Sequence, residues 1–556
     1  MSPKGYLSLI LHAHLPFVRH PELEDCLEER WLFQAITESY LPLLERLRRL
    51  SRQGVPFSLT VSLSPPLLAM LDDDLLRKRY KRYLSIMHDL ARKEVGRLGG
   101  CPQAALARMY MTRFERTLDM YENELGEDLP LAWKRLHEEG RVELLTSAAT
   151  HAYLPLLMDE ASQAVQIKTG IRAFEERFGF TPEGFWLPEC AYSPEIEPLL
   201  VSSGVKYFIL ETHGVLSATP RPRYGFHAPI RTPLGLAAFG RDIECGKQVW
   251  SADEGYPGDG AYREFHRDIA YELPCEYLGE ATPGGMRIPT GLKYYRVTDR
   301  HSEHKELYDP DAAEEKAIVH ARNFVFWRNK EAEYWGSVLG IPPLMTAPYD
   351  AELFGHWWYE GPLWIEEVLR LTAGPEAIVR SVTPSAYLEE HPPVQVAAPA
   401  PSSWGYRGYS EVWLGDQNSW IYRHLHACQE RMAVSCKRHA GATGLTARAL
   451  DQSLRELLLA QASDWPFIMT SGTVREYAQK RLVFHMGRFH TLTAQADSGR
   501  IDETYLEELE EKDNIFPFLS FESYEPCAKE PAVWSPDMTA GDESPQMGAT
   551  YLANRK

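Results

Sequence analysis

YLSLILHAHLP, at residues 6–16, predicts a buried β-strand that ends in a polar cluster. His12 and His14 stand two positions apart, and on an extended strand this spacing places both side chains on one face. The next segment, WLFQAITESYLPLLERLRRL at 31–50, carries apolar residues at helical spacing and basic residues near its end. The order of strand, polar cluster and helix indicates a first βα unit.

The same order recurs along the first half of the chain. Further strands are predicted within PFSLTVSLSPPLL (56–68), GRVELLTSAATHAYLP (140–155), GFWLPECAY (184–192) and VKYFILE (205–211). Alternating strands and helices favour an α/β fold with a parallel sheet. Polar residues stand at or just after these strands: His12, His14, His151, Glu189 and Glu211. Because ligands of parallel α/β folds bind at the carboxyl ends of the strands, we expect one site built from several strands.

Changes in composition divide the chain. The segment 215–310 is irregular and rich in Gly, Asp and aromatic residues, and long loops of this kind are often functional. The proline-rich EEHPPVQVAAPAPSSWG marks a further boundary. The predicted organisation is a first part of the barrel at 1–214, an insertion over the active site at 215–310, completion of the barrel at 311–390, a helical C-terminal domain at 391–527 and a flexible tail at 528–556.

Composition restricts the class of partner. The formal net charge of −19 disfavours nucleic acid and anionic membranes, which need a surplus of Lys and Arg. The N-terminal apolar run is too short to span a bilayer and lacks a small-residue cleavage site, so a cytoplasmic location is expected. The eight cysteines are scattered without a CxxC pair, which gives no support for a zinc finger. A neutral substrate suits this composition, and 14 Trp and 28 Tyr provide rings for sugar stacking as well as for a core.

TAPYDAELFGHWWYEGP, at 346–362, gathers acids and aromatic rings in seventeen residues. Asp350 follows a predicted strand, and Glu189 stands in an otherwise almost apolar segment, where a carboxylate is costly unless it is paired or used. Two separated carboxylates, histidines and aromatic residues in loops are typical of a glycosidase-type site. Two other classes remain open: a metal-dependent, deacetylase-like hydrolase that uses the histidines with Asp350, and a carbohydrate-binding protein without chemistry.

Five segments in this order resemble the conserved regions of glycoside hydrolase family 57. They are HAHLP, LLTSAATHAYLP, GFWLPECAY, MTAPYDAELFGHWW and LLLAQASDWPF. SSWGYRGYSEVWL and QVWSADEGYPGD with YREFHRD resemble the family's branching-enzyme subgroup. The resemblance covers about residues 5–525. It implies a (β/α)7 barrel with an inserted small domain and a helical C-terminal domain, a retaining mechanism, and neither metal nor cofactor.

The resemblance also implies roles for individual residues. Glu189 is the expected nucleophile and Asp350 the expected acid/base. His12, His14 and His151 are expected to shape the donor-sugar subsite. Residues expected to bind glucan are Trp404, Trp413, Asp464, Arg263 and Trp31. The implied reaction cuts an α-1,4 link of an α-1,4-glucan and reattaches the chain through an α-1,6 link.

Two activities on the same scaffold remain as alternatives, namely α-glucan hydrolysis and 4-α-glucan transfer. Branching enzymes of the family carry a tyrosine on a loop over the site. Here RDIECGK precedes QVWS without a tyrosine, and the nearest candidates are Tyr224 and Tyr256.

Overall fold

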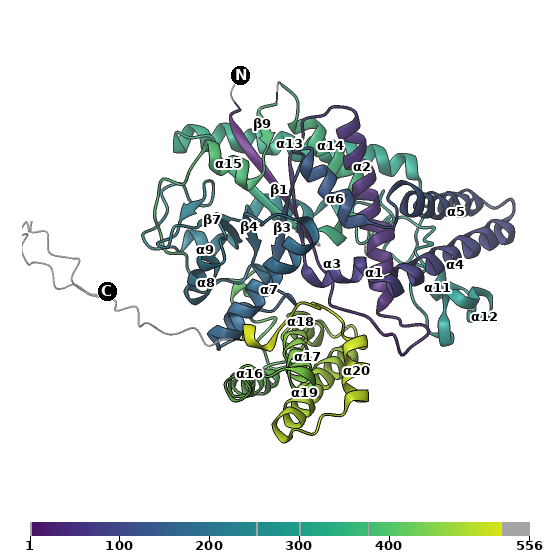
Figure 1. The fold of residues 1–556 in the computed structure, drawn as a ribbon. Coiled ribbons are helices and arrows are strands. Elements are labelled where there is room, and N and C mark those ends of the chain that lie inside the picture. Colours follow the sequence, from purple (N-terminus) through teal and green to yellow (C-terminus); the bar gives the residue numbers. More distant parts are fainter. Residues whose placement is uncertain (1–2, 252–253, 300–301, 376, 525–556) are drawn as a thin grey trace, which may run out of the picture.

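The computed structural model describes residues 3–251, 254–299, 302–375 and 377–524. Parallel strands run in the order β7-β5-β4-β3-β2-β1-β8 (Figure 1). Their bounds are β1 Gly5–Ala13, β2 Leu59–Leu63, β3 Val142–Ser147, β4 Gly184–Trp186, β5 Tyr207–Leu210, β7 Ala237–Gly240 and β8 Leu344–Asp350. Every residue of β1 is buried, as expected for a parallel strand covered on both faces.

The two ends of this sheet meet. The backbone N–H of Asp242, just after β7, donates to the carbonyl of Thr346 in β8 at 2.8 Å, and Arg241 forms a parallel bridge with the same residue. This contact closes the strands into a seven-stranded barrel, as the resemblance implied. Two short strands stand outside the ring: β6 Ile230–Arg231 pairs with β7 antiparallel, and β9 Val379–Ser381 pairs with β1.

Helices cover the outside of the barrel. They are α1 Glu29–Ala35, α2 Leu41–Arg52, α3 Pro65–Asp72, α6 Leu129–Glu138, α7 Glu160–Phe178, α8 Glu197–Ser202, α9 Thr212–Leu216, α10 Ile243–Trp250, α13 Pro310–Leu339, α14 Gly361–Thr372 and α15 Pro384–Glu390. Local sequence sets their ends, as α7 illustrates. Asp159 caps its first turn by accepting from the N–H of Ser162, and Gly179 ends it in the left-handed conformation at φ 81°.

The predicted insertion at 215–310 is wrong for its first part. β7 and α10 lie within that range, and they are a barrel strand and a helix against β8. The later part packs on a projecting helix pair, α4 Asp74–Leu98 and α5 Gln103–Asp119, with α11 Ile269–Glu272 and α12 Cys275–Leu278 beside it (Figure 1). Sequence reasoning missed β7 because AAFG is only four residues long and follows an irregular segment.

The helical domain lies on the side of the barrel toward which β1 runs (Figure 1). It consists of α16 Trp420–Arg438, α17 Gly444–Ala460, α18 Asp464–Ser471, α19 Arg475–Ser498 and α20 Glu503–Lys512. The domain was predicted to begin at 391, but part of the segment before α16 pairs with the barrel through the bridges Thr219–Ala398 and Tyr192–Ser402. The predicted tail at 528–556 lies outside the described residues.

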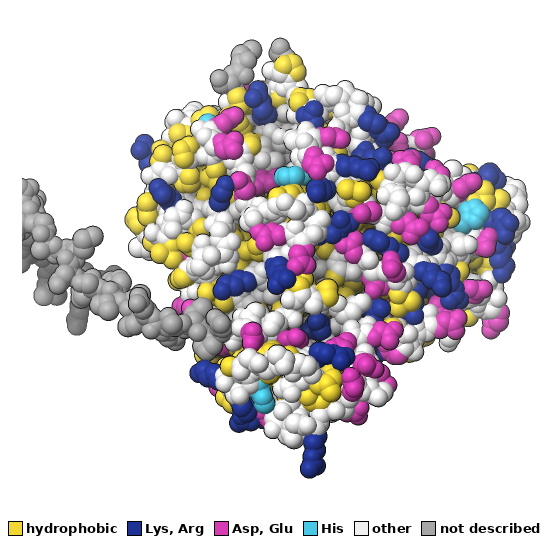
Figure 2. Space-filling model, in the orientation of Figure 1, with side chains coloured by type: hydrophobic (Ala, Val, Ile, Leu, Met, Phe, Trp, Pro, Cys, Tyr) yellow, Lys and Arg dark blue, Asp and Glu magenta, His cyan; other side chains and the backbone are white. Residues whose placement is uncertain are grey.

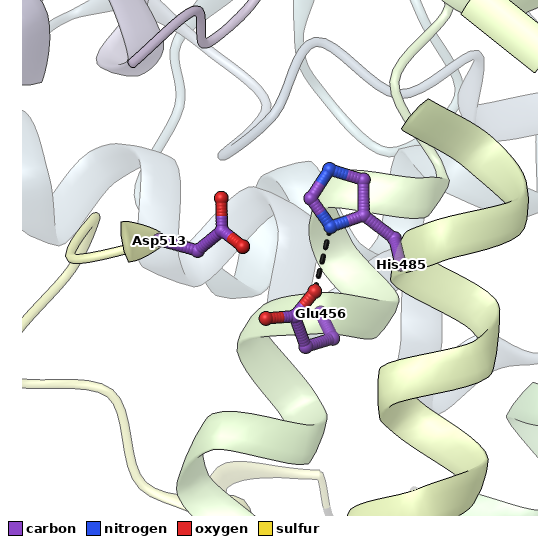
Figure 3. A group of neighbouring side chains, drawn as sticks. All are labelled: Glu456, His485 and Asp513. Carbon is purple, nitrogen blue, oxygen red and sulfur yellow. Dashed lines mark hydrogen bonds and ion pairs between the residues drawn. The ribbon is translucent and has the colours of Figure 1, made fainter. Parts of the chain in front are cut away.

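A buried polar cluster joins three parts of this domain. Glu456 of α17 accepts a hydrogen bond from His485 of α19 at 2.6 Å, and Asp513, just after α20, lies beside them (Figure 3). Arg488 forms an ion pair with Asp513 at 2.5 Å and lies 3.8 Å from Glu456. Arg481 approaches Asp513 from the same helix and donates to the carbonyl of Phe17 in the barrel at 3.1 Å. The cluster therefore links the core of the helical domain to the barrel.

Acidic and basic side chains are interspersed over the face shown in Figure 2. That face therefore presents no broad field of one sign. Among the described residues, no helix is both long enough and apolar enough to span a membrane.

Candidate active site

The carboxyl ends of three neighbouring strands place chemical groups in one row. In the β1 register, His12 stands opposite Ser62 of β2 on one side and Asp350 of β8 on the other. His14 follows the end of β1, and its Nδ1 lies 2.9 Å from the hydroxyl of Ser64. His12 thus pairs with Ser62, and His14 pairs with Ser64. Both pairs form because side chains two positions apart at the end of a strand lie on the same face.

Strained backbone places two further groups at this end of the barrel. His151 and Glu189, which follow β3 and β4, have φ of 57° and 64°, and Cys190 has φ of 49°. Non-glycine residues in this left-handed region each cost roughly 1–3 kcal/mol and cluster at functional sites. The turn at 188–190 redirects the chain directly after β4, so that the Glu189 side chain faces the site instead of continuing the strand.

Two donors hold the Glu189 carboxylate. The Trp404 indole Nε1 donates to Oε2 at 2.6 Å, and the Ser463 hydroxyl donates to Oε1 at 2.7 Å. Burial raises the pKa of Glu189, the two hydrogen bonds lower it, Asp464 raises it and His14 lowers it, which leaves the pKa at about 6. Glu189 is therefore an ionised carboxylate at neutral pH, with its orientation fixed from two sides.

Asp350 has a different environment. Burial, Glu352 and Glu189 raise the pKa of Asp350 well above its ordinary value, and Arg241 lowers it by less. Arg241 stands just after β7 and is itself paired with Glu211 at 2.8 Å. Two carboxyl groups whose environments shift their pKa values differently can divide the roles of nucleophile and acid.

The three histidines form one packed group. The His14 and His151 rings stack with centroids 3.8 Å apart, and His12 stacks on Trp186 at 4.4 Å. Burial and the neighbouring His14 lower the pKa of His12 and of His151 well below the ordinary value. Burial lowers the pKa of His14 too, but Asp464, whose carboxylate lies 3.1 Å away, and other nearby carboxylates raise it more, so the net pKa is raised.

Each ring nitrogen of the three histidines has a protein partner. His12 contacts Ser62 and His151, His14 contacts Ser64 and Asp464, and His151 contacts Ser463 and His12. Their predicted contacts with the donor sugar stay predictions. Among the described residues, the cluster with metal-ligand proximity is the buried one of Figure 3, and the histidines with Asp350 do not form such a group.

Residues 8–400 match the family model described as Glycosyl hydrolase family 57, which is more than half of the chain. The chain belongs to glycoside hydrolase family 57. Residues 424–524 of this family 57 enzyme match the model described as 1,4-alpha-glucan branching enzyme, C-terminal.

Similar proteins are named as branching enzymes or as an alpha-amylase. The family 57 chain is 35% identical to a 1,4-alpha-glucan branching enzyme of Thermococcus kodakarensis, over 92% of this chain and 77% of that one. It is 30% identical to a probable 1,4-alpha-glucan branching enzyme of Mycobacterium tuberculosis, over 90% and 93% of the two chains. Among solved structures, an alpha-amylase of Thermotoga maritima is 41% identical with a TM-score of 0.88, covering 94% of this chain and 99% of that one. The Thermococcus branching enzyme structure is 33% identical with a TM-score of 0.85, covering 94% and 96%.

Two residues predicted to bind glucan, Trp413 and Arg263, are buried, whereas a third, Trp31, is partly exposed, and glucan binding by all three stays a prediction. Trp413 is 1% exposed and packs on Tyr153, so neither face of its ring is open to a sugar. The Arg263 guanidinium is also buried, with its centre 3.8 Å from the Tyr359 ring centroid. Trp31 is partly exposed and packs edge-on against Tyr477 of α19, at the junction with the helical domain. Glycine-rich sequence around a tryptophan therefore did not guarantee exposure.

Sequence reasoning missed several residues that complete the site. Ser463 and Trp186 were not singled out as partners, although Ser463 directly precedes Asp464 in ASDWPF and Trp186 stands three residues before Glu189. From the sequence, Asp350 and Glu352 are both candidates, one as the catalytic residue and the other as its structural partner. In the structure Glu352 accepts from the Tyr40 hydroxyl and from the N–H of His14, the latter at 3.2 Å. The period-two pair Ser62 and Ser64 was the available signal for the histidine partners.

Glu352 gives a testable pH effect. Asp350 must begin protonated to act as an acid, and the charge of Glu352 raises its pKa. We expect Glu352→Gln to lower the pKa of Asp350, so that activity is lost at a lower pH on the basic limb of the pH–rate profile. The measurement is kcat/KM for amylose across pH. Glu143→Gln is the matched control, because Glu143 is a buried barrel carboxylate bonded to Tyr207 and Ser385. A basic limb that stays in place in Glu352→Gln would contradict the assignment.

Proposed function

We propose that this family 57 chain is a retaining 1,4-α-glucan branching enzyme. Its substrate is an α-1,4-glucan such as amylose or a glycogen-type polysaccharide. The observation that carries the proposal is that the domain matching the branching-enzyme C-terminal model supplies part of the site, since Ser463 bonds to Glu189 and Asp464 lies against His14. The barrel and the branching-type domain thus build one site together.

In the proposed first step, the Glu189 carboxylate attacks the anomeric carbon of a glucosyl unit. Asp350 gives its proton to the glycosidic oxygen, the carbon–oxygen bond breaks, and the remainder of the chain leaves with a new hydroxyl. A glycosyl ester on Glu189 remains. In the second step the Asp350 carboxylate takes the proton of an acceptor 6-hydroxyl, whose oxygen attacks the anomeric carbon and frees Glu189. Inversion at each step retains the α configuration.

Hydrolysis is the second candidate, and a specific observation favours it. The solved relative with 41% identity is described as an alpha-amylase, and the shared fold covers almost its whole length. The two tyrosines considered for the loop over the site do not reach it. Tyr256 is buried and donates to Asn323 of α13, and Tyr224 lines a cavity of about 340 Å³ with Tyr387 and His391. His391 contacts Tyr6, at the amino end of β1, which is the opposite end of the barrel.

An exposed ring near Glu352 provides an acceptor platform in this proposal. Trp357 is 55% exposed and stacks on Phe265 with centroids 4.5 Å apart. Its N–H donates to the carbonyl of Glu352 at 3.3 Å, which ties it to the segment of Asp350. One face of the indole is covered by Phe265, and the exposed remainder of the ring is available to a pyranose.

We expect Trp357→Ala to lower the ratio of α-1,6 bonds formed to reducing ends formed. Without the ring the acceptor sugar binds less well, so water reacts with the glycosyl ester more often. Cleavage of α-1,4 bonds should change much less. Trp250→Ala is the control, since Trp250 is also a partly exposed tryptophan but lies at the end of α10. An unchanged ratio in Trp357→Ala would remove this ring from the acceptor site.

The proposed activity itself is tested on amylose with the purified protein. Branches are counted by debranching or proton NMR, and reducing ends are measured in the same sample. Many α-1,6 links with few new reducing ends support a branching enzyme. Reducing ends without branches would replace the proposal with α-glucan hydrolysis, and new chain lengths without either would indicate 4-α-glucan transfer.

A further inference from the structure

A continuous series of hydrogen bonds ends at Glu189. The Ser62 hydroxyl lies 3.2 Å from His12 Nδ1, and His12 Nε2 lies 2.9 Å from His151 Nε2. His151 Nδ1 lies 2.9 Å from the Ser463 hydroxyl, which lies 2.7 Å from Glu189 Oε1. The series passes from β2 to β1, to the loop after β3, to the helical domain and finally to the turn after β4. It therefore connects four parts of the fold to one carboxylate.

Elementary chemistry fixes the direction of every bond in this series. An ionised carboxylate can only accept, so the Ser463 hydroxyl donates to Glu189 and accepts from His151 Nδ1–H. A neutral imidazole has one donor and one acceptor nitrogen, so His151 Nε2 accepts from His12 Nε2–H. His12 Nδ1 then accepts from the Ser62 hydroxyl. A single proton arrangement satisfies all four bonds when Glu189 is ionised.

Ser463 is held in place for this role by its backbone. Its N–H donates to the carbonyl of His151 at 3.0 Å, and Ala152 forms an antiparallel bridge with Ala462. The Ser463 side chain does not cap α18, although it stands at the start of that helix. Its hydroxyl is therefore committed to His151 and Glu189.

We propose that Ser463 is a positioning residue for the nucleophile, and that through this hydroxyl the helical domain completes the active site of the barrel. The inference rests on the proposed role of Glu189. Ser463 holds Oε1 while Trp404 holds Oε2, so the carboxylate cannot rotate away from the anomeric carbon. The same hydroxyl selects the tautomer of His151 and, through it, that of His12.

This role predicts a pH effect that simple packing would not produce. The charged and titratable groups around Glu189 are His12 and His14 at the end of β1, His151 and Tyr153 after β3, the neighbouring Cys190, Asp350 and Glu352 from the β8 segment, and Asp464 from α18. Ser463 carries no charge, so its replacement leaves this set unchanged. Because a donor to the ionised form lowers a carboxyl pKa, its loss raises the pKa of Glu189. The acidic limb of kcat/KM should then move to higher pH.

The test compares Ser463→Ala with Ser463→Thr, which restores a hydroxyl, and with the control Ser453→Ala. Ser453 is also a buried serine of the helical domain, but it bonds to Ala449 within α17. The rate of α-1,4 bond cleavage in amylose is measured across pH, whichever product the reaction forms. We expect Ser463→Ala to lower kcat by about 10- to 100-fold, the usual range for a lost bond to a charged group, with KM nearly unchanged. The acidic limb of the pH–rate profile of Ser463→Ala should move to higher pH. In Ser463→Thr, both kcat and the acidic limb should return toward those of the parent enzyme.

Three results would overturn the proposal: an unmoved acidic limb in Ser463→Ala, a rise in KM with unchanged kcat, or the same effects in Ser453→Ala. If Ser463→Ala does not fold, Ser463→Cys decides, since a thiol is a weaker donor and should give a shift of the same sign. Glu189→Gln is measured in parallel. An active Glu189→Gln would refute the proposed nucleophile, whereas an inactive Glu189→Gln with a normal Ser463→Ala would refute only the positioning role.

Discussion

Glu189→Gln is expected to lower the rate of α-1,4 bond cleavage by roughly four orders of magnitude or more, as the loss of a nucleophile usually does. An amide cannot form the glycosyl ester. Both oxygens of Glu189 accept hydrogen bonds, one from Trp404 Nε1 and the other from the Ser463 hydroxyl. The NH₂ group of a glutamine would therefore face a donor and lose one of these bonds. The measurement is kcat/KM on amylose. Glu197→Gln is the matched control, since Glu197 is a buried carboxylate eight positions along the chain that bonds to Tyr192.

Azide separates the role of Glu189 from a general loss of structure. In Glu189→Ala, azide can enter the vacated space and attack the anomeric carbon in place of the carboxylate, with Asp350 still protonating the leaving oxygen. The expected product is a glycosyl azide of inverted, β configuration. Recovery of an α-glycosyl azide, or full activity of Glu189→Gln, would contradict the role of Glu189 as nucleophile.

Asp350→Ala should show an equally large loss that depends on the leaving group. A glucan oxygen needs a proton to depart, so cleavage of amylose should fall by several orders of magnitude. Fluoride departs without a proton, so the first step on an α-maltooligosyl fluoride should remain fast. The second step then becomes slow, because no carboxylate remains to deprotonate the acceptor. Equal losses of the first step on amylose and on the fluoride would contradict the role of Asp350 as acid.

The pH dependence follows from the same two groups. Glu189 must be ionised, and its pKa of about 6 sets the acidic limb. Asp350 must be protonated, and burial, Glu352 and Glu189 raise its pKa well above the ordinary value, which moves the basic limb toward higher pH. Activity is therefore expected between the two limbs in a bell-shaped profile.

Much of the barrel was predictable because its signals are local. The apolar run of β1, the strand-end positions of His12 and His14, and the isolated carboxylate of Glu189 are all visible in short stretches of sequence. The parallel sheet and the helical C-terminal domain follow from alternation and periodicity. The structure brings Glu189, Asp350, the histidines, Trp404 and Asp464 to one end of the barrel, although their roles in the reaction stay proposals.

The burial of some predicted site residues and the role of Ser463 depend on contacts between distant parts of the chain, which no short sequence pattern encodes. Trp413 and Arg263 are buried by Tyr153 and Tyr359, which lie far from them in the sequence. Ser463 acquires its importance only when 462–463 docks on 151–152. A serine at a helix start is common, and nothing in ASDWPF indicates that its hydroxyl reaches a carboxylate 274 positions away.

The most direct test of a covalent nucleophile uses Asp350→Ala with an α-maltooligosyl fluoride. Glu189 displaces fluoride, and the glycosyl ester accumulates because the second step lacks its base. Proteolysis and mass spectrometry then locate the added maltooligosyl mass. The account predicts this mass on the peptide that contains Glu189, and its absence after Glu189→Gln is added. A modified peptide elsewhere, or fluoride release with direct formation of an inverted product and no adduct, would contradict the double displacement at Glu189.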